Sequence, residues 1–519
     1  MKSFLSRFGS KITGVLSGLD RLVFRGTLIP LVRKNGFLSF LNRACVRLVE
    51  FRAFVIETSE KLKQASLAEA RREQRPVIYL ASSQTNKEEL VGKILREQPV
   101  EKGLVCALKT VEPCLSFEYH RSPDPKERGI RLVTKKCLHI YKYWRHPSFG
   151  LIGSRLQTWF PFNCQVWLNG REWLALRMKN KEIPFERNDN CFTRIDDVES
   201  AQELMNEQLT INWKKALDDV AGRLNPLHQK IFESWPMEYN WSVYQAEWAT
   251  DLMFNDEAAL AELYPALVRH GMLCLSSEDV LRFLGKKPHG NLKAEIVTSF
   301  KKRTEGVRVK HWLSGNSIKM YNKGSLVLRV ETTTANTKSL PKVFRALTNK
   351  PKGKQAWRSM RKGVADIHRR AEVSQKANER YLDALSAVDD STPLAKIFNE
   401  VSRSVTMQGR QSRALRIGDE QDLALLEAIN RGEFTLNGVR NRDLQRLLHP
   451  DQRDASPQDK KKLSAKIGRQ IRLLRAHGIL HKVSQSHCYR LSDKGRLLCA
   501  ALSASRESTT KQLLIRDAA

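Results

Sequence analysis

Strand patterns between residues 110 and 168 constrain the fold of this chain more than any other feature. The segments LSFEYHR, GIRLVTKKCLHIYKYW and SRLQTWFPFNCQVWL have residue patterns typical of strands. Pro, Gly and Asp residues separate these segments and are typical of the turns between antiparallel strands. The region therefore predicts hairpins in an antiparallel sheet.

Helix and strand patterns fill the rest of the chain and predict an α+β fold. Residues 1–75 read as mostly helical, with room for one strand in LDRLVFRGTLIPLV, and residues 76–109 read as strand, helix, strand. The first 21 residues have apolar side chains at helical spacing and predict an amphipathic helix, with a weak targeting peptide as the alternative. A helical region is expected at 198–285, strands at 293–334 and a long helix ending near residue 388. We find no internal repeat.

These patterns divide the chain into six ranges, so a multidomain protein is expected. The ranges are an N-terminal α/β region with an antiparallel, aromatic-rich sheet (1–190), a helical acidic region (191–290), basic hairpin strands with a long helix (291–388), a linker (389–418), a C-terminal domain (419–504) and a tail (505–519).

The chain has 519 residues and a net charge of +33, which is unevenly distributed. Residues 191–290 hold 16 acidic and 9 basic side chains, whereas residues 291–418 hold 27 basic and 10 acidic ones. A protein this basic most often binds a polyanion, with nucleic acid as the first candidate and an anionic membrane surface as the second. No apolar run reaches the ~18 residues that a membrane span requires, so no membrane partner is expected.

The nine cysteines form no C-x-x-C pair, and their spacings fit no zinc ribbon or finger. They predict reduced, mostly buried thiols. Together with the basic charge, this predicts a cytoplasmic, nucleoid-associated protein.

The last hundred residues predict the order helix, strand, helix, helix, hairpin, helix. Ser456 and Pro457 start the third of these helices and Gly478 ends it. This order, with the segments IRLLRAHGILHKV and CYRLSDKGR, resembles the winged-helix DNA-binding domains of bacteria over residues 419–504. In that family the third helix enters the major groove and the wing contacts the backbone or minor groove. The resemblance implies six DNA-binding residues: Lys466, Arg469, Arg472, Arg475, Lys482 and Arg490.

An alternative is that this domain docks on a protein and its basic helix face is only solvated. Residues 440–499 contain 15 basic and 5 acidic side chains, which favours a nucleic acid.

A second resemblance covers about 25 residues in the segment 307–334. Tyr321, Asn322 and Lys323 end one strand pattern, and Arg329 and Glu331 end the next. This arrangement is similar to the rolling-circle replication initiators of plasmids and filamentous phages. It implies metal-dependent DNA nicking with a tyrosine nucleophile and a role for Lys323. The chain departs from that family because it has no His-hydrophobic-His metal motif.

The chemistry of nicking requires a divalent metal, Mg or Mn, and a nucleophile. Glu331 is a candidate metal ligand, and Glu247 and Asp251 would share one face of a helix because they are four residues apart. Tyr381, on the long helix, and Tyr321 are the candidate nucleophiles. In the alternative interpretation the tyrosines are packed aromatics and the carboxylates are ion-pair partners or solvated side chains.

Aromatic residues are concentrated at 141–173, where Lys142, Arg145, Arg155 and Arg171 lie between them. An exposed sheet of this composition can stack single-stranded bases. A large aromatic core is the alternative, and alternating strands allow both.

Two functions follow from these features. The first is a DNA-binding protein of a bacterial mobile element that acts in nicking, replication initiation or transposition. The second is a non-enzymatic nucleic-acid-binding protein, such as a transcriptional regulator or a structured-RNA partner. The sequence leaves open whether the protein is an enzyme, and it contains no P-loop, Rossmann glycine fingerprint or nucleophile elbow.

Overall fold

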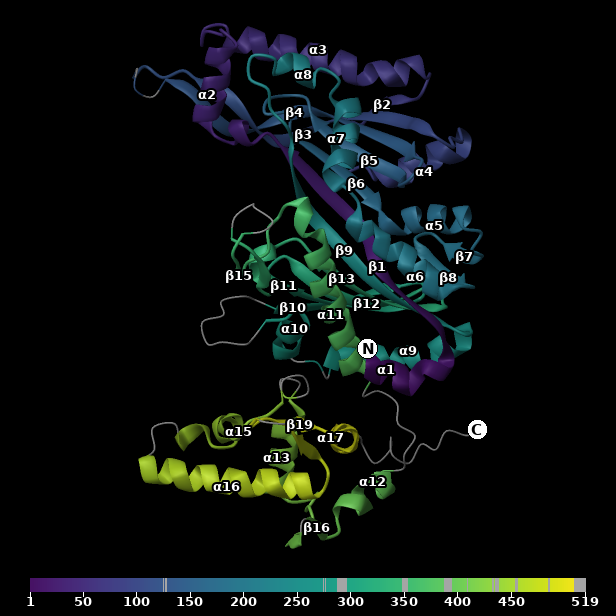
Figure 1. The fold of residues 1–519 in the computed structure, drawn as a ribbon, viewed down its shortest axis with the longest axis vertical. Helices are drawn as coiled ribbons and strands as arrows, with labels where there is room; N and C mark the ends of the chain where they lie inside the picture. The colour runs from purple at the N-terminus through teal and green to yellow at the C-terminus, as the bar shows by residue number, and fades with distance from the viewer. Residues whose placement is uncertain are drawn as a thin grey trace.

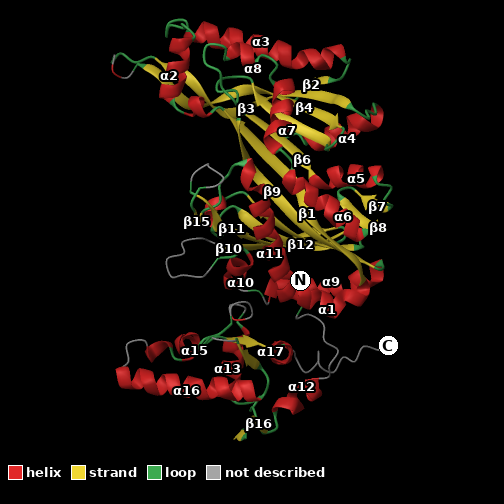
Figure 2. Cartoon of the chain, viewed as in Figure 1, coloured by secondary structure: helices red, strands yellow, loops and turns green. Residues whose placement is uncertain are grey.

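An eleven-stranded sheet, antiparallel except at one edge, forms the centre of the computed structural model (Figures 1 and 2). The structure describes the whole chain except residues 125, 127, 274, 276, 287–295, 348–352, 387–393, 408, 432–433, 435–437, 453–455, 484–485 and 508–519. Helices pack on both sides of the sheet, and a mainly helical unit follows it at the C-terminal end. The predicted α+β class is confirmed.

The strand order across the sheet is β10-β11-β12-β13-β9-β1-β6-β5-β4-β3-β2, and only β2 pairs in parallel. The strands are β1 (Ile12–Thr27), β2 (Val77–Tyr79), β3 (Gly103–His120), β4 (Gly129–His146), β5 (Gly150–Gln157), β6 (Cys164–Asn169), β9 (Asn240–Phe254), β10 (Ile296–Arg303), β11 (Gly306–Leu313), β12 (Asn316–Lys323) and β13 (Val327–Thr334). The hairpins predicted at 110–168 are confirmed, as is the order strand, helix, strand at 76–109.

The sheet consists of two halves with the same strand order. In the first half the long strand β1 pairs with β6, the last strand of the meander β3-β4-β5-β6. In the second half the long strand β9 pairs with β13, the last strand of the meander β10-β11-β12-β13. The two long strands pair with each other in antiparallel orientation. The chain therefore contains a topological repeat that its sequence does not reveal.

The helix expected around Glu247 and Asp251 is wrong, because both residues lie on β9. The half of this strand that follows Trp248 is buried on both faces, so it lacks the alternation of a half-buried strand. Residues 1–190, 191–290 and 291–388 all supply strands to the one sheet. At the N-terminus, helix α1 (Lys2–Phe8) is shorter than expected, because β1 already begins at Ile12.

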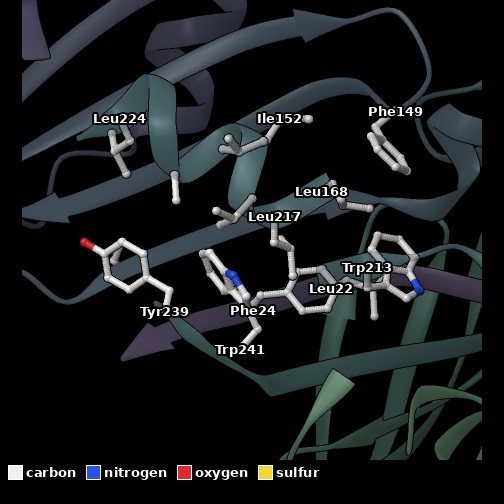
Figure 3. Close-up of a cluster of buried hydrophobic side chains, with 14 of the residues drawn as sticks. Leu22, Phe24, Phe149, Ile152, Leu168, Trp213, Leu217, Leu224, Tyr239 and Trp241 are labelled. Atoms are coloured by element: carbon white, nitrogen blue, oxygen red, sulfur yellow. The ribbon is translucent and has the colours of Figure 1, made fainter. Parts of the chain in front are cut away.

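One face of the sheet carries a large part of the main hydrophobic core, and the same cluster also includes Leu174 and Met205 from the opposite side. In the first half, Leu22 and Phe24 of β1 belong to the same core cluster as Trp213 and Leu217 of helix α7 (Figure 3). In the second half the same face packs against helices that include α11, whose Tyr381 and Leu382 belong to a separate cluster. The helices of this face are α3 (Phe51–Arg72), α7 (Trp213–Leu224), α9 (Glu257–Leu273) and α11 (Ile367–Leu385).

The opposite face of the sheet is covered only in part. Helices α5 (Gly170–Asn180) and α6 (Val198–Glu207) and the hairpin of β7 (Phe185–Asn188) and β8 (Cys191–Ile195) lie there, on the side of the sheet away from α11 (Figure 1). Arg171 of α5 contacts Asp251 of β9. A side chain added at Gly18 of β1 would collide with Met205 of α6, which shows how closely that helix approaches.

The C-terminal unit has the expected order of helices and a hairpin. Ser456 caps the long helix, Pro457 begins it and Gly478 follows it with a φ of +71°. Most of the strand expected at 432–438 lies outside the described residues, although Val439 bridges Tyr489. The assignment as a winged helix stays a prediction. The elements are α13 (Glu420–Asn430), α15 (Asn441–Leu448), α16 (Pro457–Ala476), β18 (Leu480–Lys482), β19 (Tyr489–Leu491) and α17 (Asp493–Glu507).

No helix in the described part of the chain is both long and apolar enough to cross a membrane. The cysteines of the described residues form no disulfide with one another.

The range 389–418, which the sequence predicts as a linker, contains helix α12 (Leu394–Val401) and a small hairpin, β16 (Val405–Met407) with β17 (Arg410–Ser412).

Candidate functional site

Three carboxylates from three neighbouring strands converge on the partly covered face of the sheet. Asp20 comes from β1, Glu247 from β9 and Glu331 from β13, and one ligand oxygen of each lies within 4.8 Å of the others. β9 pairs with both of the other strands, and a register shift between Leu19 and Leu22 in β1 lies next to Asp20. We call Asp20, Glu247 and Glu331 the carboxylate triad.

The sequence predicted Glu247 and Glu331 as metal ligands but missed Asp20. The available signal was a single acidic residue inside the apolar strand pattern LSGLDRLVF. Asp251, the third predicted ligand, lies on the same face of β9 as Glu247 but outside the triad. Arg329 contacts both of its carboxylate oxygens, at 2.5 and 2.8 Å, and Arg171 lies 3.1 Å away. Asp251 is therefore an ion-pair partner in this structure.

Arg329 connects the triad to Asp251. Its guanidinium lies 3.0 Å from Asp20 and also donates a 2.8 Å hydrogen bond to the backbone carbonyl of Asn190. Asp20 and Arg329 are almost completely buried. Burial alone would raise the pKa of Asp20, but the charges of Arg329 and Arg171 hold it below its usual value. Asp20 therefore stays ionised inside the protein.

Glu247 has the opposite electrostatic environment. Burial, followed by the nearby charge of Glu331, raises the pKa of Glu247 to about 7, although Lys319 opposes this shift. Glu331 lies 2.6 Å from Lys319 and accepts a 2.9 Å hydrogen bond from the hydroxyl of Tyr321. Carboxylates crowded in this way are stabilised by a proton or a divalent cation.

The oxygen donors of the triad fit Mg or Mn better than a softer metal, because hard cations prefer carboxylate ligands. All three donors come from adjacent paired strands, so the backbone keeps the three residues close to one another. Glu331 already has an ion-pair partner in Lys319, so a bound cation would share this carboxylate or displace the ammonium group.

Tyr321 lies at the triad, and Lys323 lies two residues farther along the same face of β12. The Tyr321 side chain is nearly buried, and Arg303 and Lys319 lie over its ring, each 5.4 Å from the ring centre. Lys323 extends to the turn between β7 and β8, where it contacts Asn190 and lies 3.1 Å from Asp189. The structure therefore brings Tyr321 to the predicted metal ligands and directs Lys323 to the adjacent turn.

Tyr381 does not share this site, which corrects its expected role beside Glu331. Its side chain is completely buried in an apolar cluster with Leu328 and Val330, and its hydroxyl lies 3.2 Å from His311. Successive residues of a strand point to opposite faces, so Leu328 and Val330 face away from Glu331. Tyr381 and the triad are therefore separated by the sheet.

A cluster of cations borders the triad on β11 and β12. Lys310 and Lys319 are direct cross-strand neighbours, and burial, then the charges of Lys319 and Arg308, lower the pKa of Lys310. The Lys310 ammonium lies 4.7 Å from the ring centre of Trp312, a residue that is 49% exposed. This part of the sheet can contact phosphates with its cations and a base with its tryptophan.

The aromatic block at 141–173 is mainly a core. Tyr143, Trp144, Phe160 and Trp173 are buried, and so are several other aromatic rings of that block. Tyr141 and Trp167 line an open cavity of about 330 Å³ with Arg21 and Arg155. The base-stacking surface expected in this half of the sheet therefore stays a prediction, because most of the aromatic rings of the block are buried.

The predicted DNA-contacting residues lie together on the C-terminal unit. Ile467, Ile471 and Leu474 of α16 are buried, as the sequence predicts. The cations occupy the remaining surface of the helix and the hairpin. Lys466, Arg469 and Arg472 are exposed on α16, Arg475 is half-buried beside Tyr489, and Lys482 and Arg490 are exposed on β18 and β19. No described carboxylate forms an ion pair with any of these six cations.

Comparisons with protein-family models, with curated proteins and with solved structures found no match to this chain.

Proposed function

We propose that this protein binds DNA and that α16, with the β18–β19 hairpin, forms the duplex-contacting surface. The observation that supports this most is that Lys466, Arg469 and Arg472 are exposed on α16 and form no ion pair with any carboxylate of the described structure. Cations that are not neutralised within the protein are available to replace the counterions of DNA phosphates. A helix with one apolar and one basic face also fits the width of the major groove.

The arrangement is consistent with the winged-helix resemblance. The apolar stripe of α16 packs into its own domain, and the hairpin carries Lys482 and Arg490 at exposed positions where a wing would contact the backbone. We extend the proposal to a cytoplasmic, nucleoid-associated location, since a DNA-binding surface of this kind requires access to the chromosome.

Duplex binding by the full-length chain tests the proposal. Replacement of Lys466, Arg469 and Arg472 together by Ala should weaken binding of a random-sequence duplex by at least tenfold, because each phosphate contact contributes to affinity. The matched control replaces Lys179, Lys181 and Lys230, which are also exposed. Equal affinities for the two triple variants would contradict the proposal and favour a protein-docking role for α16.

A second candidate function, metal-dependent strand cleavage, is favoured by the convergence of the carboxylate triad. Asp20, Glu247 and Glu331 would hold Mg or Mn, and such an ion polarises a scissile phosphate. The Tyr321 hydroxyl donates its hydrogen bond to Glu331, so Glu331 is placed to accept the proton when the phenol oxygen attacks phosphorus. A bond from the Tyr321 oxygen to phosphorus would form as the bond from phosphorus to the DNA 3′ or 5′ oxygen breaks, and that leaving oxygen would take a proton from water. This activity would suit nicking, replication initiation or transposition by a mobile element.

Incubation with supercoiled and single-stranded DNA in Mg or Mn tests the second candidate. Tyr321→Phe and Glu331→Gln should each abolish both nicking and the covalent protein–DNA adduct. Tyr381→Phe is the control and should retain both, because Tyr381 lies on the other side of the sheet. Absence of cleavage by the unmodified protein would leave the non-enzymatic function, a regulator or structured-RNA partner, as the remaining interpretation.

A further inference from the structure

A small hairpin between β13 and α11 forms a sheet of its own. It consists of β14 (Val343–Ala346) and β15 (Gln355–Arg358), and it lies beside the large sheet in Figure 1. Its base is fixed to the protein, because Val343 and Met360 pack together with Leu340 and contact Val373 of α11. Arg361 also donates a 2.9 Å hydrogen bond to the carbonyl of Ala346. The hairpin is therefore an anchored projection.

Two aromatic side chains form an exposed pair on this hairpin. Phe344 and Trp357 are direct cross-strand neighbours, and their ring centres are 5.8 Å apart. Phe344 is 51% exposed and Trp357 is 66% exposed. Trp and Phe side chains are strongly apolar and are normally packed in the core. An exposed pair of them therefore indicates a surface that binds a partner.

The charge around the pair is positive and favours an anionic partner. Between Glu331 and Asp366 the sequence has nine Lys or Arg residues and no acidic residue. Four of the cations are exposed on the described part of the hairpin and its flanks, and no described carboxylate pairs with them. They are Lys342, Lys354, Arg358 and Lys362.

We propose that the β14–β15 hairpin binds a single-stranded segment of DNA, with bases stacked on Phe344 and Trp357 and phosphates beside the surrounding cations. A single strand is required because the base faces of a duplex are already stacked on each other, whereas unpaired bases stack readily on aromatic side chains. The inference rests on the proposed DNA binding and adds a contact that is separate from α16. It gives the protein one surface for duplex DNA and another for an unpaired strand.

Fluorescence anisotropy with a labelled twenty-nucleotide oligothymidine and a labelled duplex tests this proposal on the full-length chain. The double variant Phe344→Ala/Trp357→Ala should bind oligothymidine about tenfold or more weakly, because each stacked base contributes substantially to affinity. Duplex affinity should stay within about twofold. Trp357→Phe should retain most of the single-strand affinity, since it keeps an aromatic ring.

Tyr79→Ala is the matched control, because Tyr79 of β2 is 57% exposed and lies outside the hairpin. Ultraviolet crosslinking of bromouracil-substituted oligonucleotide should attach it to the peptide that contains Trp357. If the double variant kept its oligothymidine affinity while duplex binding still depended on α16, the single-strand inference would be wrong and the proposed duplex binding would stand. The proposed function is tested separately, by whether the triple variant of Lys466, Arg469 and Arg472 loses affinity for the duplex.

An anionic lipid surface is the competing partner for a basic aromatic hairpin. Co-sedimentation with vesicles containing phosphatidylserine distinguishes the two. If the double variant lost vesicle binding but kept oligothymidine binding, the single-strand proposal would be wrong.

Discussion

The Asp20 carboxylate accepts a 3.0 Å hydrogen bond from Arg329, although the two residues are 309 positions apart in the chain. They come from β1 and β13, the two strands that pair with β9 on either side. Arg329 also binds Asp251 on β9 itself. One buried guanidinium thus joins the central strand to both of its neighbours and connects the two halves of the sheet.

This arrangement predicts that Arg329→Met destabilises the protein strongly. The variant leaves Asp20 and Asp251 buried with only part of their compensating charge, and such a loss typically costs about 3–5 kcal/mol of unfolding free energy. Urea denaturation followed by tryptophan fluorescence measures it. Arg177→Met removes an exposed pair with Glu207 and should cost less than about 1 kcal/mol. Similar losses in both variants would show that the buried network contributes little.

The raised pKa of Glu247 predicts an unusual pH dependence of stability. The folded state holds this proton up to a pKa of about 7, compared with 4.5 for an ordinary glutamate. The stability contributed by protonation is therefore complete below pH 4.5 and is lost as the pH rises through 7. Burial first, and then the charges of Glu331 and Asp20, raise the pKa of Glu247, whereas Lys319 and Arg21 lower it.

Glu247→Gln should therefore be more stable than the unmodified protein above pH 7, by on the order of 1–3 kcal/mol. The difference should shrink as the pH approaches 4.5. Thermal melting at several pH values measures it, with Glu203→Gln at an exposed position of α6 as the control. A constant difference across the pH range would show that Glu247 does not hold its proton in the folded protein.

Divalent metal should stabilise the folded protein if the triad binds it. An ion present at one hundred times its dissociation constant would add about 2.7 kcal/mol, so the melting temperature should rise with added Mg or Mn. Glu331→Gln should abolish most of this rise, whereas Asp256→Asn, a change outside the triad, should not. Equal responses of these two variants would place the metal elsewhere.

The salt dependence of duplex binding provides a test of α16 at the level of one residue. Arg472→Ala should weaken binding on all sequences and lower the slope of log affinity against log salt concentration by about 1, the value expected for one lost phosphate contact. Lys230→Ala is the control for a general change in charge. An unchanged slope in Arg472→Ala would exclude a phosphate contact at this position.

The sequence predicted elements whose signals are local. Ser456, Pro457 and Gly478 mark the ends of α16 because caps depend on the residues beside them. β9 was mistaken for a helix because its buried half has no alternation, so the spacing of Glu247 and Asp251 fitted either structure. Asp20 was missed because only the pairing of β1 with β9 brings it to Glu247. The two halves of the sheet share a strand order, and a strand order cannot be predicted from the pattern of neighbouring residues.

The pairing of β1 with β9 also has a consequence for how this protein is made. β1 leaves the ribosome before β9, and β6 can cover one of its edges once the first meander has formed. The other edge keeps its backbone hydrogen-bonding groups unpaired until β9 has been synthesised, and exposed strand edges promote association with other chains. A nascent chain that ends between β6 and β9 would thus be prone to aggregate until β9, which ends at Phe254, has been made.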